Sequence, residues 1–436
     1  MTKNSDYLER GKHRIPGLTQ LLSKRPDQFA PGVWPTYFSK ASGTLVWDLD
    51  GCKYIDMSIS GIGANILGYC DPDVDAAVIQ CVQSGNSTSL NAPEDVELAE
   101  LLCGIHPWAD KVRYTRTGGE AMTVAVRIAR AATGRDRVAF CGYHGWSDWY
   151  LAANLESDDF LNGHLLPGLS PLGVPKGLLG TALPFRYNQI EELKTIFDKY
   201  SGEVAAVVME PLRNEMPAPG FLEAVKSLAK EAGAVLIFDE VSSGFRLNTG
   251  GAHLLMEVEP DIAVFAKAIS NGYPMAAIIG RGEVMDAVER TFISSTYWTD
   301  RIGPVAALAT IRKHQAENVS ANLSEIGNAV QDLWRQSASE AGLSINVYGI
   351  PPMSYFGFNS PDAQAMMTFY VQEMLKNGFL AANRFYANFA QKTEHVEKFG
   401  IAMRSVFNDI SILSRKGSLT DHLVGGVSQP GFHRLN

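Results

Sequence analysis

The stretch Ala-Val-Leu-Ile-Phe-Asp-Glu-Val-Ser-Ser-Gly-Phe-Arg, residues 234–246, decides the fold of this chain. Its first five residues are all apolar, and the run ends abruptly at two acids, Asp239 and Glu240. A run of this length is typical of a strand buried on both faces of a parallel sheet. Ligands of open α/β sheets bind beyond the carboxyl ends of the strands, so we expect Asp239 to lie in a ligand-binding crevice.

A second apolar run, residues 262–266, is followed directly by Lys267. A carboxylate and an amine at the tips of two buried strands are what pyridoxal phosphate (PLP) chemistry requires. The lysine would form the Schiff base, and the acid would pair with the pyridinium nitrogen. Taken singly, an aspartate at a strand end is more often a cap or turn residue, and a lysine is more often solvated. Many α/β enzymes place charges at strand tips, so the spacing alone leaves the assignment open.

The motifs themselves carry a resemblance to a known family. Phe-Asp-Glu-Val-Ser-Ser-Gly-Phe-Arg (238–246) and Ala-Lys-Ala-Ile-Ser-Asn-Gly-Tyr-Pro (266–274) resemble the class III aminotransferases of PLP fold type I, most closely the glutamate-1-semialdehyde aminomutases. The resemblance implies an α/β fold with a mostly parallel seven-stranded sheet and a smaller α+β domain built from both chain ends. We expect the N-terminal arm and small-domain part at 1–75, the large PLP-binding domain at 76–310 and the C-terminal small domain at 311–436.

Composition narrows the class of protein. The chain has 436 residues, 46% of them hydrophobic and 19% charged, with a net charge of −9, which favours a soluble globular protein that binds neither nucleic acid nor membrane. The N-terminus lacks the apolar core of a secretory signal, and no uninterrupted apolar run is long enough to span a bilayer. Five cysteines without a Cys-x-x-Cys pair argue against a disulfide framework and against a metal site, so we expect a cytoplasmic protein.

A phosphate site is predicted at Thr117, Gly118 and Gly119, between a short strand and a long helix. Free backbone N–H groups at a helix N-terminus favour a phosphate dianion, although an ordinary glycine-containing turn would look the same. By resemblance these residues bind the cofactor's phosphate. The family usually has Ser-Gly-Thr here, so one hydroxyl contact has moved or been lost while the amides remain.

The resemblance assigns further residues to the cofactor. Tyr143 would stack on one face of the pyridine ring, and Val241 would pack on the other. Glu210 ends a third apolar strand and would face the same crevice. His144 follows Tyr143 and is a secondary candidate, because a single histidine is more often a satisfied core residue. Lys267, Asp239 and Tyr143 are the expected catalytic residues: Lys267 binds PLP and carries a proton, and Asp239 keeps the pyridine nitrogen protonated.

A threonine that reaches the phosphate of the partner subunit's cofactor is implied by the family's Gly-Thr-x-x-Gly-Asn-Pro loop. Counting back from Pro304 selects Thr299, whereas the preceding Ser-Thr favours Thr296, and both stay open. Such a threonine requires a homodimer with shared active sites.

Two arginines stand where the chain departs from the aminomutases, Arg213 and Arg301. A guanidinium suits a carboxylate or phosphate, so we hypothesise that at least one contacts an anionic group of the substrate. The alternative is that they pair with Glu215 or Asp300 and order their loops.

Three functions are compatible with these residues. The first is transfer of an amino group from an amino donor to a ketone or aldehyde acceptor, and the second is intramolecular transfer, as in an aminomutase. The third is a non-catalytic protein of the PLP fold, against which the intact Lys267, Asp239 and Tyr143 argue.

Outside the site, the sequence predicts an irregular arm over residues 1–45 and a β-hairpin over 44–56 around an Asp-Gly turn. It further predicts one long helix over 305–341 and an irregular tail over 410–436.

Overall fold

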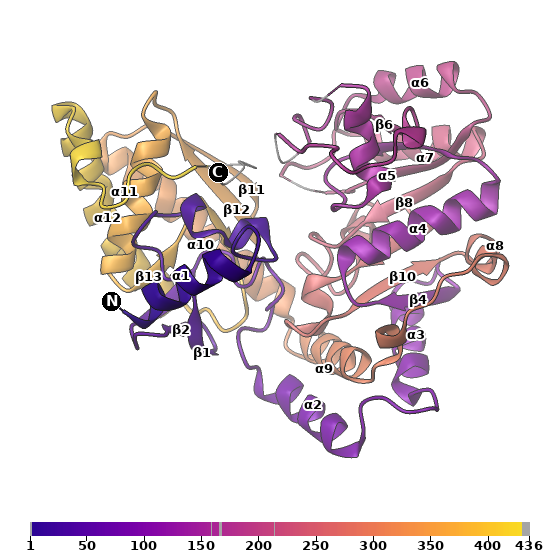
Figure 1. The fold of residues 1–436 in the computed structure, drawn as a ribbon, viewed down its shortest axis with the longest axis horizontal. Coiled ribbons are helices and arrows are strands. Elements are labelled where there is room, and N and C mark those ends of the chain that lie inside the picture. The colour runs from indigo at the N-terminus through magenta and orange to yellow at the C-terminus, as the bar shows by residue number, and fades with distance from the viewer. Residues whose placement is uncertain (1, 158, 165–167, 213, 430–436) are drawn as a thin grey trace. The chain divides into compact units, whose positions relative to one another are not determined.

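A computed structural model describes residues 2–157, 159–164, 168–212 and 214–429. The chain forms two compact units (Figure 1). The larger unit consists of residues 72–320, and the smaller one combines residues 1–71 with 321–436.

The larger unit is built on a seven-stranded sheet with the strand order β4-β10-β9-β8-β7-β5-β6. Its strands are β4 (Lys111–Thr115), β5 (Arg137–Cys141), β6 (Ala182–Pro184), β7 (Val204–Met209), β8 (Val235–Asp239), β9 (Ile262–Phe265) and β10 (Ala276–Gly280). Neighbours from β9 to β6 run parallel, and β10 is antiparallel to both β4 and β9. The expected mostly parallel seven-stranded sheet is therefore confirmed.

Helices cover both faces of this sheet, because parallel strands need crossover connections. The α-helices of the unit are α2 (Pro72–Ser84), α3 (Pro93–Ile105), α4 (Gly118–Thr133), α5 (Asp148–Leu151), α6 (Ile190–Lys199), α7 (Phe221–Glu231), α8 (Gly282–Met285) and α9 (Ile302–Ala316). Helix α4 packs on one face, and α6 and α7 pack on the other (Figure 1).

Strand β8 shows how the alternation of side chains separates the two faces. Val235 and Ile237 pack with α4, whereas Leu236 and Phe238 pack with α6 and α7. All residues of β8 are buried, as expected for a central strand of a parallel sheet. Continuing the alternation places Asp239 on the α4 face and the following residue on the opposite one.

The smaller unit contains a four-stranded sheet, β1-β2-β3-β13, and a three-stranded one, β11-β12-β14. Its strands are β1 (Phe38–Ser42), β2 (Leu45–Asp48), β3 (Lys53–Met57), β11 (Ile345–Ile350), β12 (Met353–Phe358), β13 (Phe379–Ala381) and β14 (Arg384–Tyr386). Its helices are α1 (Lys3–Arg14), most of α10 (Val319–Ala341), α11 (Ala363–Lys376) and α12 (Thr393–Lys416).

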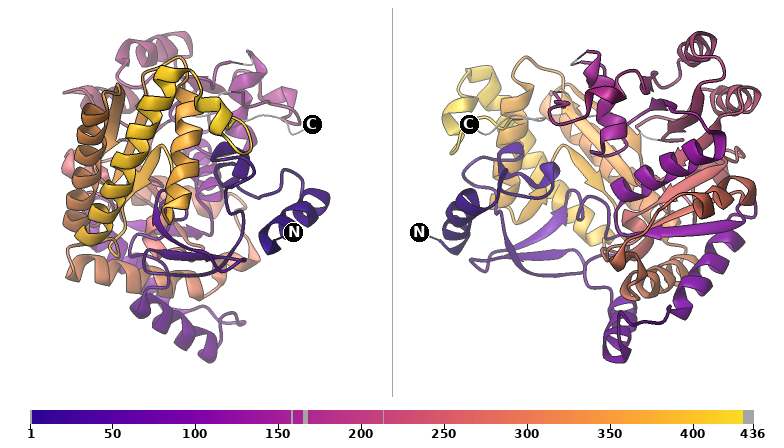
Figure 2. Two further views of the ribbon diagram at one scale, coloured as in Figure 1. Left: turned by 90° about the vertical axis from the view of Figure 1, so that its left-hand side faces the viewer. Right: turned by 45° about the vertical axis from the view of Figure 1, so that its right-hand side comes forward.

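Both ends of the chain contribute to this unit, as expected. Strand β13 pairs in parallel with β3, so Phe379 lies beside Ile55. Figure 2 shows the indigo N-terminal and yellow C-terminal segments together in the unit. The predicted hairpin is confirmed, since β2 and β3 are antiparallel neighbours.

Three local predictions were wrong. Residues 3–14 of the expected irregular arm form α1, whose first turn is capped by the hydroxyl of Thr2. The expected single helix over 305–341 is divided into α9 and α10, because Asn318 adopts a left-handed conformation between them. The supposed irregular tail begins instead with the last turns of α12, which ends at Gly417 with a φ of 65°.

Among the described residues, no helix combines the length and the apolar character that a membrane crossing requires.

Candidate active site

Three neighbouring parallel strands carry polar side chains at their carboxyl ends. The order β9-β8-β7 puts Lys267, Asp239 and Glu210 at adjacent positions along one edge of the sheet. Asp239 and Glu210 are buried, with 5% and 7% of their surfaces exposed. Because burial of a carboxylate is costly unless it is hydrogen-bonded, the partners of these acids define the site.

Asp239 is held by a histidine. Its Oδ2 lies 2.8 Å from Nδ1 of His144, and its Oδ1 accepts the N–H of Val241 at 3.0 Å. The other ring nitrogen of His144 lies 3.1 Å from the carbonyl oxygen of Cys141. His144 is buried, and both of its ring nitrogens are engaged, one of them by Asp239.

Lys267 stands in a strained backbone conformation. Its φ is 51°, in the left-handed region that non-glycine residues seldom occupy, and it opens a 3₁₀ turn over Lys267–Ser270. Its amine donates a hydrogen bond to the hydroxyl of Ser242 at 2.8 Å. This conformation turns the side chain from the tip of β9 towards the segment that follows β8.

Ser242 is a site residue that the sequence analysis missed. The only available signal was its position, three residues after Asp239 in the motif that starts the site. A serine is too common in loops to be singled out on that basis, and its role follows only from the contact with Lys267.

The predicted phosphate site lies at the N-terminus of α4. Thr117 is the N-cap: its hydroxyl accepts the amide of Glu120 and donates to the Glu120 carboxylate, which forms a capping box. The structure therefore commits the hydroxyl of Thr117 to the helix. Among the described residues, no hydrogen-bond acceptor contacts the amides of Gly118 and Gly119.

Gly118 brings this helix end to the strand tips. A Cβ at Gly118 would stand 2.9 Å from a methyl of Val241 and 3.6 Å from the Cβ of Ala266. Any larger residue would therefore separate the phosphate end from the residues next to Asp239 and Lys267.

Tyr143 lies near Asp239 on the loop after β5. Its ring is partly buried and meets Tyr150 edge-on, with the ring centroids 5.9 Å apart. Burial and, to a smaller extent, the charge of Asp239 raise the pKa of Tyr143, so the phenol stays protonated. On the same loop, Gly142 approaches Glu210 so closely that a Cβ there would lie 2.7 Å from its carboxylate.

The segment with the two candidate threonines is anchored from within the same unit. The buried guanidinium of Arg116 forms an ion pair with Asp300 and donates to the carbonyl oxygens of Trp298 and Asp300. Thr296 and Thr299 are both exposed, and the hydroxyl of Thr299 donates to the carbonyl oxygen of Thr296 at 2.8 Å.

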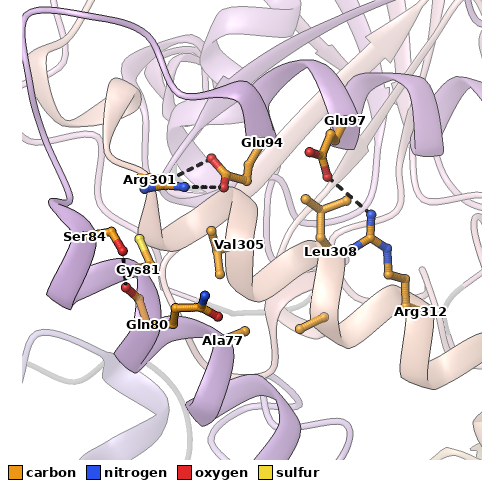
Figure 3. Close-up of a pocket in the computed structure, with 11 residues that line it drawn as sticks. Ala77, Gln80, Cys81, Ser84, Glu94, Glu97, Arg301, Val305, Leu308 and Arg312 are labelled. Atoms are coloured by element: carbon orange, nitrogen blue, oxygen red, sulfur yellow. Dashed lines mark hydrogen bonds and ion pairs between the residues drawn. The ribbon is translucent and has the colours of Figure 1, made fainter.

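Arg301 does not pair with Asp300, so that expectation was wrong. Its Nε and Nη2 both donate to Glu94, at 2.8 and 2.7 Å, in a pocket between α2, α3 and α9 (Figure 3). None of the residues predicted to bind the cofactor lines this pocket. Arg213, the other arginine of the hypothesis, lies outside the described residues.

Comparisons with known proteins agree with this arrangement. Residues 29–383 match the family model of the class III aminotransferases. The chain is a class III aminotransferase. The enzyme is 31% identical to the 3-aminobutyryl-CoA aminotransferase of Cloacimonas acidaminovorans over 86% of this chain and 89% of that protein. It is 34% identical to the glutamate-1-semialdehyde 2,1-aminomutase of Anaeromyxobacter dehalogenans over 87% and 94% of the two chains.

The fold of this aminotransferase has a similar solved structure. The FumI protein of Sphingopyxis sp. MTA144, solved in its PLP internal aldimine form, superposes with a TM-score of 0.86 at 24% identity, over 97% of this chain and 98% of that one. Fold type I is confirmed.

The aminotransferase is PLP-dependent, and its residues fit the cofactor. The unbonded amides of Gly118 and Gly119 suit a phosphate, Asp239 suits a pyridinium nitrogen, and the Lys267 amine suits an aldehyde. The close contact between Gly118 and Val241 keeps these groups within one site.

Proposed function

We propose that this aminotransferase moves an amino group between two separate substrates, with Lys267 and Asp239 as the central catalytic residues. The supporting observation is that the Lys267 amine, the Asp239 carboxylate and the amides of Gly118 and Gly119 come together at one edge of the sheet. When bound, PLP supplies an aldehyde that accepts the amino group and a pyridine ring that accepts electrons.

Each residue then has a defined task. Lys267 would hold the aldehyde of the cofactor, and its Nζ would move a proton at the substrate carbon that bears the amino group. Asp239, supported by His144, holds the proton on the pyridine nitrogen. Tyr143 and Val241 would pack on opposite faces of the ring, and Glu210, next to Gly142, would border it.

Replacement of Lys267 by alanine tests the assignment. The visible absorbance of the lysine-bound cofactor should disappear, while PLP still binds through the amides and Asp239. Borohydride reduction of the wild-type protein followed by peptide mapping should find the label on Lys267. A label on another lysine would overturn the assignment.

The alternative is an intramolecular aminomutase, favoured by the 34% identity to a glutamate-1-semialdehyde aminomutase. A half-reaction with an amino donor separates the two functions. An aminotransferase releases a keto product and retains the amino group on the cofactor, whereas an aminomutase returns the same atoms rearranged. A panel of ketones and aldehydes added to the aminated enzyme would then identify the acceptor.

We further propose that the active enzyme is a homodimer. Several large apolar side chains of the larger unit are exposed on α2, on α3, on the loop between them and on the segment around the candidate threonines: Ile79, Val82, Leu90, Val96, Phe292 and Tyr297. A second copy would bury such side chains. None of the five cysteines is in a disulfide, which supports a reducing, cytoplasmic setting.

Thr296 is the better candidate for the contact in trans, because its hydroxyl proton is not donated within the described residues, whereas that of Thr299 is. Mixed dimers of a Lys267→Ala subunit and a Thr296→Ala subunit test both points. One of the two sites in each mixed dimer would then be intact, and activity should exceed that of either parent. No recovery on mixing, or a monomer by light scattering, would contradict the shared site.

A further inference from the structure

Trp146 lies against the N-terminus of α4. A Cβ at Gly119 would stand 3.2 Å from its indole Nε1 and 3.5 Å from its Cδ1, so the N–H edge of the ring faces Gly119. The preceding residue, Gly145, has a φ of 104°. A Cβ at Gly145 would stand 3.4 Å from the Cα of Gly119. The indole thus occupies the volume that a side chain at position 119 would need.

A second set of contacts fixes this loop on the helix. Thr123 donates its hydroxyl hydrogen to the carbonyl oxygen of Gly119 at 2.9 Å. The hydroxyl of Ser147 must therefore be the donor in its 2.6 Å bond to Thr123. Trp146 is held on both sides, by Gly145 packed on Gly119 and by Ser147 bonded to Thr123.

The indole N–H is available for a ligand. Trp146 is 71% exposed, and no acceptor for its N–H is found in the part of the chain that the structure describes. The neighbouring amides of Gly118 and Gly119 likewise have no acceptor there, while the hydroxyl of Thr117 is committed to Glu120. Three N–H donors therefore lie together at this helix end, and the hydroxyl of Thr117 is not available as a fourth donor.

We propose that the indole N–H of Trp146 binds the phosphate of the cofactor, as the side-chain donor that Gly119 does not provide. The inference rests on the proposed placement of PLP and assigns a binding residue to it. A charge-assisted bond from a neutral donor to a phosphate oxygen is short and directional, and the backbone of Trp146 is already fixed by its neighbours Gly145 and Ser147 before the bond forms. Glycine at position 119 is then required, because a larger residue would displace the ring.

The test compares PLP with pyridoxal, which lacks the phosphate, by equilibrium titration of the apoenzyme. Trp146→Phe keeps an aromatic ring but removes the donor. We expect it to weaken PLP binding about tenfold or more, the scale of a hydrogen bond to a charged group, and to leave pyridoxal binding unchanged. Trp146→His, which keeps a ring N–H, should retain more of the affinity for PLP.

A reciprocal pair strengthens the test. Trp146→Ala should weaken PLP binding, and adding Gly119→Thr to it should restore part of the affinity, because a hydroxyl now enters the vacated volume. Gly119→Thr alone should give no gain, since its Cβ would crowd the indole.

Unchanged PLP affinity in Trp146→Phe would overturn the proposal. Equal weakening of PLP and pyridoxal would overturn it as well, because the ring would then act through packing. Failure of the wild-type protein to bind PLP at Lys267 would be a failure of the proposed cofactor site itself, which the borohydride experiment detects separately.

Discussion

Two carboxylate–histidine pairs stand side by side at the tip of β8, and they differ in what they can do. Asp239 lies 2.8 Å from Nδ1 of His144, and the next residue, Glu240, lies 2.8 Å from Nδ1 of His253. All four side chains are buried. Consecutive residues of a strand point to opposite faces, so Asp239 lies on the face covered by α4 and Glu240 on the face covered by α6 and α7.

The contact made by Nε2 of each histidine sets the number of protons that the carboxylate–histidine pair holds. Nε2 of His253 accepts the indole N–H of Trp108 at 3.0 Å, so this ring is neutral and donates from Nδ1 to Glu240. Nε2 of His144 instead faces the carbonyl oxygen of Cys141, which can only accept. Nε2 of His144 must therefore carry a hydrogen, and its contact with Asp239 requires a second one, so this pair holds one proton more than the pair of Glu240 and His253.

The carboxylates also differ in how fully they are satisfied. Glu240 accepts the ring and the backbone N–H of His253 and the hydroxyl of Ser243. Burial alone would raise the pKa of Glu240, but these bonds outweigh it and hold the pKa below its ordinary value. Asp239 keeps capacity to accept a hydrogen bond from the cofactor. These contacts suit a structural role for Glu240 and His253, whereas our proposed cofactor site uses Asp239 and His144.

The strongest test of this difference is the same acid-to-amide change at Asp239 and at Glu240. Asp239→Asn should lower amino-transfer turnover about 10²–10³-fold, because the charge that stabilises the pyridinium is lost. Glu240→Gln, the matched control, should stay within a few-fold of wild type, since the Ser243 hydroxyl can rotate to accept from the new amide. Steady-state rates of PLP-loaded protein measure both. Equal losses in the two variants would show that the faces are not distinct.

Removing the carboxyl group of Glu240 should lower the stability of the protein rather than its turnover. Glu240→Ala leaves the His253 donors and the Ser243 hydroxyl without an acceptor in a fully buried site, at a cost of about 2–3 kcal/mol in the free energy of unfolding. Thermal denaturation should show a lower midpoint, with turnover per folded, PLP-loaded enzyme retained. An unchanged midpoint would contradict the structural role.

The two histidines sharpen the comparison further. His144→Gln removes the titratable hydrogen-bond partner of Asp239, and we expect turnover to fall about tenfold with an altered pH dependence, the scale of one hydrogen bond to a charged group. His253→Gln should lower the thermal midpoint and leave the shape of the pH–rate profile as in wild type. Identical profiles for all three proteins would mean that His144 does not act through Asp239.

The smallest effect concerns His106, which stacks on His253 with ring centroids 5.5 Å apart. Burial lowers the pKa of His106 to about 4 from 6.5, so the unfolded chain binds a proton that the native ring does not. The free energy of unfolding therefore keeps its full value above pH 6.5, as far as His106 is concerned, and falls as the pH drops towards 4. Between pH 7 and pH 5.5 it should fall by about 1 kcal/mol. His106→Gln should reduce the pH dependence of the thermal midpoint in this interval, and an unaltered slope would exclude His106 as its source.

The sequence predicted the sheet because its strands are short apolar runs that end in polar residues. Asp239, Lys267 and Glu210 could be placed at strand tips for the same reason, since β7, β8 and β9 are neighbours whose carboxyl ends meet at one edge. Hydrophobic patterning was less informative for α1. Its residues are strongly polar and show no apolar periodicity, although Thr2 caps the helix.

Contacts between distant residues could not be predicted. Arg301 pairs with Glu94 rather than with the adjacent Asp300, which instead pairs with Arg116. Neighbouring charges in a sequence are not neighbours in space when the backbone turns between them, and here α9 starts immediately after Arg301.

The sequence by itself therefore determined which residues end the strands, which glycines open α4 and, through its motifs, which family the chain belongs to. These are properties of local pattern, because burial and backbone conformation act over a few residues. The tertiary structure decided the rest: that Nε2 of His144 faces a carbonyl oxygen, that the Ser242 hydroxyl accepts a hydrogen bond from the Lys267 amine and that Trp146 lies over Gly119. Hydrogen-bond partners and close packing depend on where separate elements meet, and that position is fixed only when the whole sheet and its helices are assembled.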